Sequence, residues 1–306
     1  MLDIGSTEFW VYASQNDSVQ PSGLLSYTQL YEPGSSPTWQ SIPNATFSSG
    51  YAAGFTATGI VGTDSLTVGQ LPPVRQYVGV MWYTEPVMDS QQIQGILGLG
   101  LSSGGTSGTM GTPTFLDLLL PQLELPLFTI AVDKWGTGTW DFGHINATKY
   151  VGAMQSIPVD GSCDIGGSWV VANISAQFPE GTIAQANCGM FDTGYDLINL
   201  DASIVARYYQ DVPGANSATV PGQYTFPCNT SLPDLGLAID GSGVTIPGHV
   251  LNYHPYNVEA SICMGALQSS GDGGSAFFGQ AFMMAQFLVL NVGDTTISFA
   301  EIAQDL

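Results

Sequence analysis

Two short stretches of the chain each carry an aspartate followed two positions later by a glycine. The first reads MLDIG (residues 1–5) and the second reads MFDTG (residues 190–194). Two carboxyl groups held close together cannot both ionise cheaply, so they share a proton and titrate as a pair. The charged partner can then take a proton from water while the protonated partner polarises a substrate carbonyl. The pair Asp3 and Asp192 therefore predicts hydrolysis without a covalent intermediate.

The residues around each aspartate suit a tight loop that supports a carboxyl group. Gly5 and Gly194 lack a Cβ atom, which favours a close approach of two backbones. The Ser6 hydroxyl can hydrogen-bond a carboxylate oxygen, and backbone N–H groups of the loop can supply further donors. We expect these contacts to hold the two carboxyl groups in place.

Such loops need strands to position them, and the sequence is rich in strand signals. Residues 57–83 and 287–300 alternate β-branched and aromatic residues with turn residues, and the chain has 38 glycines. Helical spacing is limited to residues 112–122 and 201–212, with expected starts at Thr114 and Asp201. The prediction is an all-β protein with few short helices.

The two halves of the chain repeat one order of features. Each half begins with its aspartate motif, continues with strand-rich sequence, and ends with an apolar stretch that contains glycine. These stretches are GILGLG (residues 95–100) and AFFGQAF (residues 276–282). We expect two lobes related by a pseudo-twofold axis, residues 1–150 with the first aspartate and residues 151–306 with the second.

Composition limits the function classes. The 306 residues contain 44% apolar side chains, enough to bury a large core, and carry a formal net charge of −21. Binding to nucleic acid or to an anionic membrane is therefore not expected. With only 4 Lys and Arg, most carboxylates have no salt-bridge partner. Stability should rise as the pH falls from about 7 toward 4, because mutual repulsion is removed.

Cysteines and glycosylation signals favour a secreted or vacuolar glycoprotein. Cys163, Cys188, Cys228 and Cys263 form no CxxC pair and have no clustered His, so disulfides are expected and a metal site is not. Five Asn-x-Ser/Thr sequons occur, at Asn16, Asn44, Asn146, Asn173 and Asn229. Without an uninterrupted apolar stretch of about 18 residues, a transmembrane helix is not expected. The run AFFGQAFMMAQFLVLNV is interpreted as adjacent strands.

The motifs resemble a known family along nearly the whole chain. Residues 3–11 (DIGSTEFWV) and 191–198 (FDTGYDLI) resemble the two active-site motifs of pepsin-like aspartic proteinases. Residues 51–55 (YAAGF) and 59–64 (GIVGTD) are similar to the flap hairpin of that family, whose tyrosine closes over bound peptide. The stretch GILGL (residues 95–99) resembles the strand that supports the first aspartate, and Phe278-Gly279 resembles its counterpart.

The resemblance implies a bilobal pepsin-like fold and a secreted, fungal-type acid endopeptidase made as a zymogen. It implies a monomer without a cofactor that acts on a peptide or protein substrate. Its implied catalytic residues are Asp3 and Asp192. Substrate-binding and flap positions are Tyr51, Ala52, Ala53, Trp10, Ile96 and Gly194, with Trp10 hydrogen-bonded to Tyr51, and the supporting residues are Gly5, Ser6 and Thr193. The implied disulfides are Cys163–Cys188 and Cys228–Cys263.

The sequence departs from the family pattern at several places. Ile4 stands where a threonine usually links the two lobes, and Tyr195 stands where a short hydroxyl side chain usually supports the second aspartate. Ala53 replaces a polar flap residue, and Gln280 replaces an acidic residue that is common there. Family members also have strand-rich sequence before the first aspartate, so we expect a truncated or processed chain.

Two other functions remain open. A pepsin-like pseudoenzyme or a peptide-binding glycoprotein would keep the cleft without turnover, and Ile4 and Tyr195 motivate it. A glycosidase also uses paired carboxylates, but holds them about 5 to 9 Å apart. The carboxylates of Glu8 and Asp196 are interpreted as solvated or locally hydrogen-bonded groups. His144, His249 and His254 have no metal-site spacing.

Overall fold

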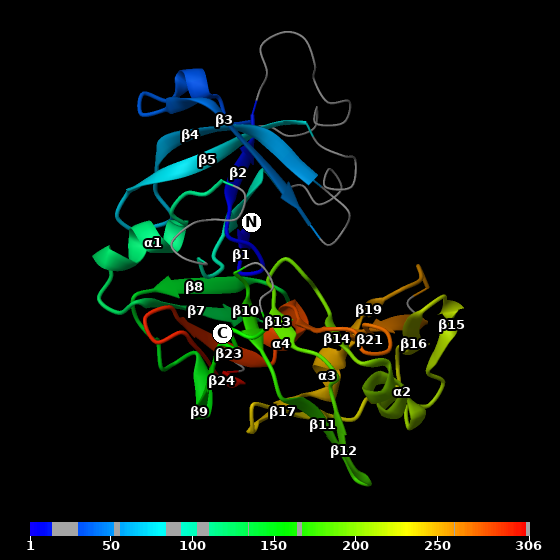
Figure 1. Ribbon diagram of the computed structural model, residues 1–306. Coiled ribbons are helices and arrows are strands. Elements are labelled where there is room, and N and C mark those ends of the chain that lie inside the picture. The colour runs from blue at the N-terminus through cyan, green and yellow to red at the C-terminus, as the bar shows by residue number, and fades with distance from the viewer. Residues whose placement is uncertain are drawn as a thin grey trace. The chain divides into compact units, whose positions relative to one another are not determined.

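The computed structural model describes residues 1–13, 30–51, 56–83, 93–102, 110–133, 135–163, 167–259 and 261–303, and it is built mainly of strands (Figure 1). The predicted all-β class with few short helices is confirmed. Two compact units are present: unit 1 is Met1–Leu123 with Gly166–Ser168, and unit 2 is Glu124–Ile165 with Trp169–Leu306. Residues 124–150 thus belong to unit 2, whereas the division into lobes at residue 150 stays a prediction.

Unit 1 is built on one six-stranded sheet. In spatial order its strands are β1 (Leu2–Asp3), β6 (Gly95–Gly98), β2 (Phe9–Tyr12), β5 (Val74–Tyr83), β4 (Thr56–Leu66) and β3 (Gln40–Gly50). The long antiparallel strands β3, β4 and β5 lie side by side in Figure 1. Two short 3-10 helices, η2 (Pro33–Ser35) and η4 (Leu120–Gln122), also belong to this unit.

The core of unit 1 lies on the sheet face that carries Trp10. Trp10 is fully buried, and it packs with side chains from β2, β3, β4, β5 and β6. The cluster consists of Trp10, Tyr12, Phe47, Ala57, Val61, Met81 and Ile96. Alternation along β2, in which Trp10 and Tyr12 are buried while Phe9 and Val11 are less so, places this face inward.

Within the described residues, unit 2 contains four sheets. The first is β10 (Trp169–Val171), β13 (Gly189–Phe191), β22 (Ala276–Phe278), β14 (Ile198–Leu200) and β21 (Leu267–Ser269). The second is β12 (Gly181–Ala184), β11 (Ile174–Phe178), β17 (Leu235–Ile239) and β18 (Ser242–Ile246). The third is β15 (Asn216–Val220), β16 (Gln223–Pro227), β20 (Ile262–Gly265) and β19 (Asn252–Pro255). The fourth is β8 (Gly138–Phe142), β7 (Leu127–Val132), β23 (Gln286–Asn291), β24 (Thr296–Ile302) and β9 (Tyr150–Pro158).

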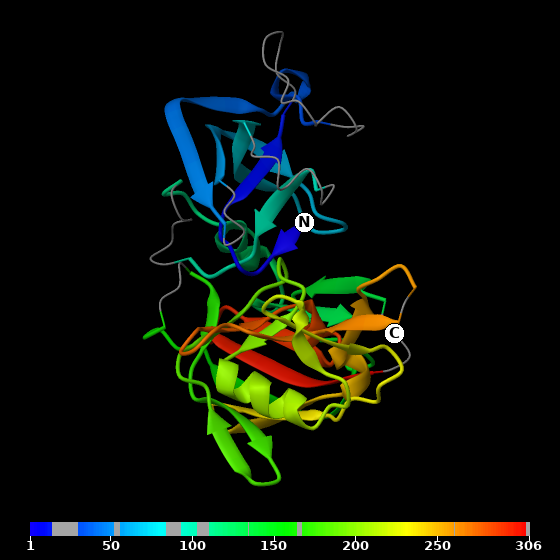
Figure 2. The same cartoon turned by 90° about the vertical axis from the view of Figure 1, so that its right-hand side faces the viewer.

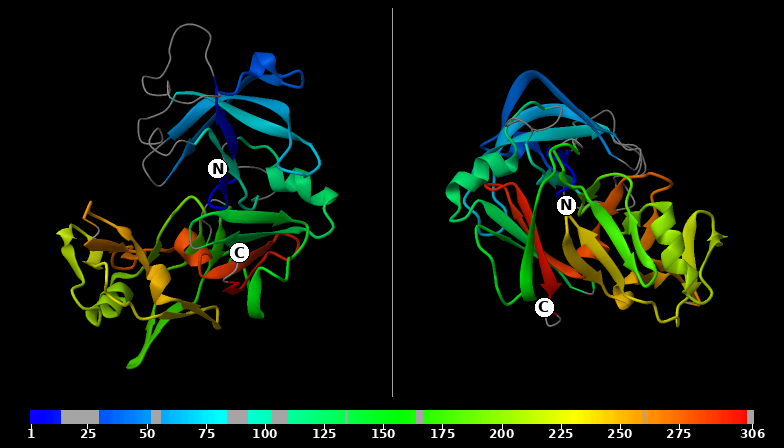
Figure 3. Two further views of the ribbon diagram at one scale, coloured as in Figure 1. Left: turned by 180° about the vertical axis from the view of Figure 1, so that it is seen from behind. Right: turned by 60° about the horizontal axis from the view of Figure 1, so that its bottom comes forward.

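Buried aromatic rings join the first and fourth sheets of unit 2. Phe191 of β13 contacts Phe278 of β22 with ring centroids 5.0 Å apart, and both rings contact Phe282. Phe282 in turn meets Phe299 of β24 edge to face. Strands β7, β23 and β24 are paired neighbours, drawn in green and red in Figure 3. The residue before Asp192 is thus fixed in a dense core.

The two predicted helices begin where their capping signals indicate. Helix α1 (Phe115–Leu119) is capped by Thr114, whose side chain accepts from the Asp117 N–H in a capping box. Helix α2 (Ala202–Gln210) is capped by Asp201, which accepts from the Ser203 N–H. Figure 2 shows α2 beside the β11–β12 hairpin. Within the described ranges, the helices fall short of the length and hydropathy that a membrane span requires.

One prediction of local structure is correct for two strands and wrong for the segment between them. The run AFFGQAFMMAQFLVLNV, interpreted as adjacent strands, forms β22 and β23 with a short helix, α4 (Gln280–Met283), between them. The helix closes because the N–H groups of Met283 and Phe282 donate to the Gly279 carbonyl, while its Ala, Phe and Met side chains are buried. A further one-turn helix, α3 (Gly248–Leu251), follows Pro247.

Candidate active site

The loop that carries Asp3 is built by three strands of unit 1. Strand β1 runs parallel to β6, with Asp3 opposite Gly98, and β6 is antiparallel to β2, with Ile96 opposite Trp10. The chain therefore leaves β1 at Asp3, turns through residues 4–8, and returns as β2 on the other side of β6. Strand β6 therefore lies between β1 and β2, and Asp3 is the last residue of β1.

The same arrangement recurs in unit 2 around Asp192. Strand β13 is parallel to β22, with Phe191 opposite Phe278, and β22 is antiparallel to β14, with Ile198 opposite Phe278. Asp192 follows β13 directly, and its N–H donates to the Phe278 carbonyl at 3.1 Å. The repeat inferred from the sequence is thus a repeat of strand pairing within each unit.

One glycine in each supporting strand lies against the aspartate loop. The Gly98 N–H donates to the Glu8 carbonyl at 2.8 Å, and the Gly279 N–H donates to the Leu197 carbonyl at 2.9 Å. A Cβ atom on either glycine would lie within 3.0 Å of backbone atoms of its loop. The glycines of GILGLG and AFFGQAF are therefore required by the crossing of two backbones.

Both carboxyl groups accept a backbone hydrogen bond from their own loop. The Gly5 N–H donates to Asp3 Oδ1 at 2.9 Å, and the Gly194 N–H donates to Asp192 Oδ1 at 2.7 Å. The Ser6 hydroxyl donates to Asp3 Oδ2 at 2.5 Å. Asp3 is only 4% exposed, whereas Asp192 is half-buried. Each loop therefore presents its carboxyl group in a fixed orientation.

Tyr51 lies at the end of β3 and is anchored on Trp10. The indole Nε1 of Trp10 donates to the Tyr51 hydroxyl at 2.6 Å, the hydrogen bond that the resemblance implies. Burial raises the pKa of Tyr51 well above its ordinary value, and the charges of Asp3 and Glu8 raise it further. Ala52 and Ala53, the other predicted flap residues, lie outside the described residues.

The remaining predicted site residues lie on the same two loops and their supporting strands. Ile96 is buried in the core cluster of unit 1, on the strand opposite Trp10. Thr193 is buried, and its carbonyl accepts from Gln280 Nε2 at 3.3 Å. Gly194 is exposed. The site roles of these residues stay predictions.

Comparison with known proteins finds similarity to aspartyl proteases along nearly the whole chain. The sequence model of the eukaryotic aspartyl protease family matches residues 1–302. Penicillopepsin-1 of Penicillium janthinellum is 33% identical over 309 residues, which cover 98% of this chain and 90% of the relative. Endothiapepsin of Cryphonectria parasitica is 31% identical over 302 residues, covering 98% of this chain and 70% of the relative. The chain belongs to the eukaryotic aspartyl protease family.

In this aspartyl protease, the side chains at two positions of the aspartate loops differ between unit 1 and unit 2. Tyr195 takes the position that corresponds to Ser6, but its hydroxyl donates to Asn199 Oδ1 at 3.0 Å. Ile4, at the position of Thr193, is fully buried and brings a methyl-rich side chain in place of a hydroxyl.

Two buried carboxylates of unit 1 lie outside the predicted site, and only Glu8 was interpreted from the sequence. Glu8 is 3% exposed, and its Oε1 accepts from the Met110 N–H at 3.3 Å, so it is a locally hydrogen-bonded group and not a solvated one. Asp64 accepts from the hydroxyls of Tyr31 and Thr38 and from the Ser65 N–H. Tyr31 and Thr38 are distant from Asp64 in the sequence, so no local signal could have revealed these two hydrogen bonds.

The predicted disulfides are confirmed, whereas the predicted glycosylation sites can only be located. Both disulfides are present in the protease, Cys163–Cys188 and Cys228–Cys263, as the resemblance implies. The sequon asparagines Asn44, Asn173 and Asn229 are exposed and Asn146 is half-buried, whereas Asn16 lies outside the described residues. Asn173 Nδ2 donates to Asp240 at 3.0 Å. Glycosylation itself stays a prediction.

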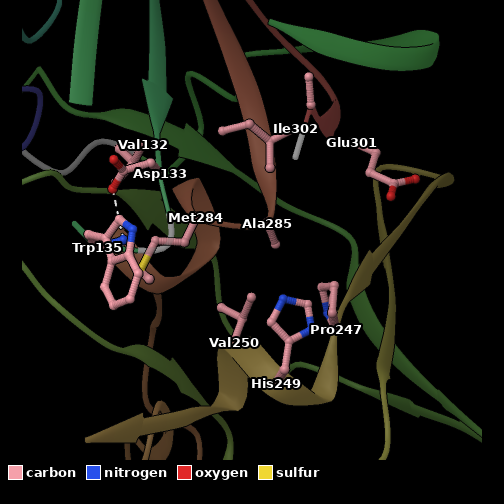
Figure 4. A pocket seen from close by; sticks show the side chains of 11 residues that line it. Val132, Asp133, Trp135, Pro247, His249, Val250, Met284, Ala285, Glu301 and Ile302 are labelled. Atoms are coloured by element: carbon pink, nitrogen blue, oxygen red, sulfur yellow. Dashed lines mark hydrogen bonds between the residues drawn. The ribbon is translucent and has the colours of Figure 1, made fainter. Parts of the chain in front are cut away.

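A separate cavity of about 100 Å³ lies in unit 2, next to the turn between β7 and β8 (Figure 4). Trp135 stands at its edge with 80% of its surface exposed, and the Trp135 N–H donates to Asp133. The lining includes Val250 of α3, Met284 and Ile302. None of the predicted site residues that the structure describes lines this cavity, so no part of the protease chemistry is assigned to it.

Proposed function

We propose that the protein is an acid endopeptidase in which Asp3 and Asp192 act as one catalytic pair. The observation that carries the proposal is the repeated loop: each aspartate follows a short strand, and each accepts at Oδ1 the N–H of the glycine two residues later. Membership of the aspartyl protease family gives this repeat its chemistry. The two lobes, residues 1–150 and 151–306, each supply one carboxyl group.

The proposed reaction uses one shared proton. The charged carboxyl takes a proton from a water molecule, and that water attacks the carbonyl carbon of the scissile peptide bond. The protonated carboxyl donates its proton to the carbonyl oxygen, so a neutral tetrahedral diol forms. Collapse of the diol returns a proton to the amine that leaves. No covalent bond to the enzyme forms at any step.

The proposed substrate is an extended peptide or protein, with Tyr51 closing over it from the end of β3. The anchor on Trp10 supports this role, because it fixes the position of the phenol. By the family resemblance, hydrophobic side chains next to the scissile bond are favoured. The net charge of −21 argues against a polyanionic partner.

We further propose secretion, which the two disulfides and five sequons support. A monomeric state stays a prediction.

The proposal is tested by proteolysis of an acid-denatured protein between about pH 3 and 5, the range in which carboxyl pairs titrate. Asp3→Asn and Asp192→Asn should each lower kcat/KM by more than about 1,000-fold. Asp272→Asn, the same change at an exposed aspartate of unit 2, should leave the rate unchanged. A statine-type inhibitor should block the wild-type protein. Absence of cleavage by the wild-type chain over the whole range would contradict the proposal.

A second function is favoured by one observation, the hydrogen bond of Tyr195 to Asn199 in place of a short hydroxyl beside Asp192. A protein with this loop could bind peptide without cleaving it. Calorimetric titration with the same statine-type inhibitor separates the two functions. Binding together with turnover supports the peptidase, and binding without turnover supports a peptide-binding protein.

A further inference from the structure

A groove of about 450 Å³ in unit 2 is lined by residues 172–175 and 184–188. The chain passes from β10 to β11 through the first segment and from β12 to β13 through the second, and Figure 1 labels these four strands. The segments lie side by side because the Gln185 N–H donates to the Ile174 carbonyl at 2.8 Å. None of the lining residues carries a charge, in a chain of net charge −21. The groove therefore suits a neutral, polar ligand better than an ion.

One wall of this groove is held in place by side-chain amides. Gln185 Nε2 donates to the Gly274 carbonyl at 2.6 Å, and Gln185 Oε1 accepts from the Asp201 N–H at 2.7 Å. Asn187 Nδ2 donates to the Gly273 carbonyl. These bonds tie the wall to a neighbouring turn, so it needs little rearrangement to receive a ligand.

The other segment carries Asn173, the asparagine of the sequon Asn173-Ile174-Ser175. Its exposed side chain is oriented by Asp240, because Nδ2 donates to Asp240 Oδ1 at 3.0 Å and the Asp240 N–H donates to the Asn173 carbonyl at 3.2 Å. N-glycosylation replaces one of the two Nδ2 hydrogens, and the other can still donate to Asp240. A sugar on this nitrogen therefore starts at the groove.

We propose that Asn173 is N-glycosylated and that the first sugars of its glycan lie in this groove, beside the half-buried Cys188. The inference rests on the proposed secretion, because the modification belongs to that route. In the transfer, a bond forms between Asn173 Nδ2 and C1 of the first sugar, and the bond between C1 and the diphosphate of a polyprenol-linked oligosaccharide breaks. The polyprenyl diphosphate leaves, and the Nδ2 proton is released to solvent.

The size and the lining of the groove fit this occupant. Its volume lies in the range of about 300 to 1,000 Å³ that is ordinary for pockets that hold small organic molecules. Ala172, Ala184 and Ala186 leave room for the C–H faces of a sugar ring, while Ser175 and Asn187 bring polar groups for its hydroxyls. A tethered glycan has an effective concentration of about millimolar order, so weak contacts are enough to hold it.

The experiment uses the whole protein, secreted by a eukaryotic host that adds short high-mannose glycans. Mass spectrometry of glycopeptides should find Asn173 occupied. An endoglycosidase that cuts between the first two sugars should trim this glycan roughly tenfold more slowly on the native protein than on the denatured and reduced protein, since the sugars must leave the groove before cleavage. None of these measurements depends on peptidase activity.

Two tryptophan variants separate the groove from general effects of folding. Ala186→Trp fills the groove at an exposed position, and Thr182→Trp is its matched control, exposed on β12 but outside the lining. Ala186→Trp should restore fast trimming of the native protein, and Thr182→Trp should leave it slow. Equal trimming rates for the native and the denatured wild type, or slow trimming of Ala186→Trp, overturn the inference.

The occupancy of the sequons distinguishes this inference from the proposed secretion. Glycans at other sequons together with an unmodified Asn173 overturn the inference and leave secretion intact. A secreted protein without any glycan also overturns the inference while supporting secretion. A chain that the host retains and does not glycosylate contradicts both.

A second measurement uses the disulfide Cys163–Cys188, which the glycan should shield because Cys188 lines the groove. Ser175→Ala destroys the sequon and Ser175→Thr keeps it, so these two variants differ in the glycan while Asn173 is unchanged. Dithiothreitol should reduce this bridge roughly tenfold faster in the Ala variant than in the Thr variant, because reduction depends on access to the sulfur atoms. The bridge Cys228–Cys263 should react at one rate in both. Equal rates for Cys163–Cys188 would overturn the placement of the glycan in the groove.

Discussion

The Trp10 indole N–H donates to the Tyr51 hydroxyl across 2.6 Å, with the two rings edge to face at 6.3 Å. Trp10 belongs to β2, the strand that leaves the Asp3 loop. Tyr51 directly follows β3, which lies at the far edge of the same sheet. The anchor of the flap residue is thus part of the element that fixes the first aspartate. Loss of the Tyr51 hydroxyl should therefore affect catalysis more than folding.

Tyr51→Phe removes this hydrogen bond and keeps the ring. A hydrogen bond of this kind contributes about 1 kcal/mol, so kcat/KM should fall roughly fivefold if the orientation of Tyr51 serves the transition state. Tyr77→Phe is the matched control, because Tyr77 packs on the same core cluster. Steady-state kinetics on a synthetic peptide checks both. Equal rates for Tyr51→Phe and the control would show that the Tyr51 hydroxyl has no role in turnover.

The two supporting glycines predict a selective effect on stability. Gly98→Ala and Gly279→Ala each force a Cβ atom against backbone atoms, which cannot move as a flexible side chain can. The free energy of unfolding should fall by at least about 2 kcal/mol for each. Gly34→Ala in unit 1 and Gly243→Ala in unit 2 are controls, since nothing lies within 4 Å of a Cβ atom there. Urea denaturation followed by tryptophan fluorescence measures all four, and unfolding midpoints of Gly98→Ala and Gly279→Ala no lower than those of the controls would disprove the effect.

Local signals account for what the sequence could predict. Thr114 and Asp201 are helix caps whose partners lie two or three residues away, so both helix starts were predictable. The repeated Asp-x-Gly stretches and their glycine-containing partners marked the strand arrangement of each unit. The Trp10–Tyr51 hydrogen bond came from the family resemblance, because nothing in the spacing alone pairs these residues.

The features that escaped prediction depend on contacts between distant segments. Asp64 gains its donors from Tyr31 and Thr38, which the sheet of unit 1 brings to β4. Helix α4 forms within a run that is apolar on all sides, where periodicity cannot separate a strand from a buried helix. The bond of Tyr195 to Asn199 required the register of β14 to be known. Tertiary structure decides each of these cases.

Asp64 should be a major stabilising residue of unit 1. Its carboxylate accepts from Tyr31 at 2.5 Å and from Ser65 N–H at 2.7 Å, with a third bond from Thr38. Asp64→Asn removes the charge and replaces one acceptor oxygen by a donor, so the free energy of unfolding should fall by about 2 to 4 kcal/mol. The matched change Asp117→Asn, at a helix cap of the same unit, should cost less, about 1 kcal/mol. Thermal melting ranks the two variants, and an equal loss would refute the assigned role.

The stability of the folded protein should pass through a maximum as the pH is lowered. From about pH 7 to 4 stability rises, because protonation of unpaired carboxylates relieves repulsion in a chain of net charge −21. Burial alone would raise the pKa of Asp64, but the hydroxyl and N–H donors outweigh it and hold that pKa below its usual range. Hydrogen bonds from Ser203 and Gly273 likewise lower the pKa of Asp201.

A carboxyl whose pKa is lower in the folded state stabilises the fold above its unfolded pKa and loses that effect as the pH falls through the folded value. Stability should therefore fall again below about pH 4, the ordinary carboxyl range. In Asp64→Asn this acid-side fall should be smaller than in the wild type. Melting temperatures measured across the range test both statements, and a steady decline from neutral pH downward would contradict the first.

The two disulfides should differ in what their loss does to catalysis. Cys188 directly precedes β13, and Cys163 and Cys188 pack with Met190 of that strand, two residues before Asp192. Cys228 and Cys263 instead join β16 and β20 in another sheet. The bridged residues are separated by 25 and 35 positions, so loop entropy gives each bridge a similar contribution of roughly 3.5 kcal/mol.

The double variants Cys163→Ser/Cys188→Ser and Cys228→Ser/Cys263→Ser should therefore lose similar stability. At a temperature where both remain folded, only the first should lose kcat, because only that bridge holds the strand that carries Asp192. Calorimetry and active-site titration, performed on the same preparations, separate the two effects. If the Cys228/Cys263 variant lost kcat as much as the Cys163/Cys188 variant, the bridge next to β13 would have no special part in positioning the second aspartate.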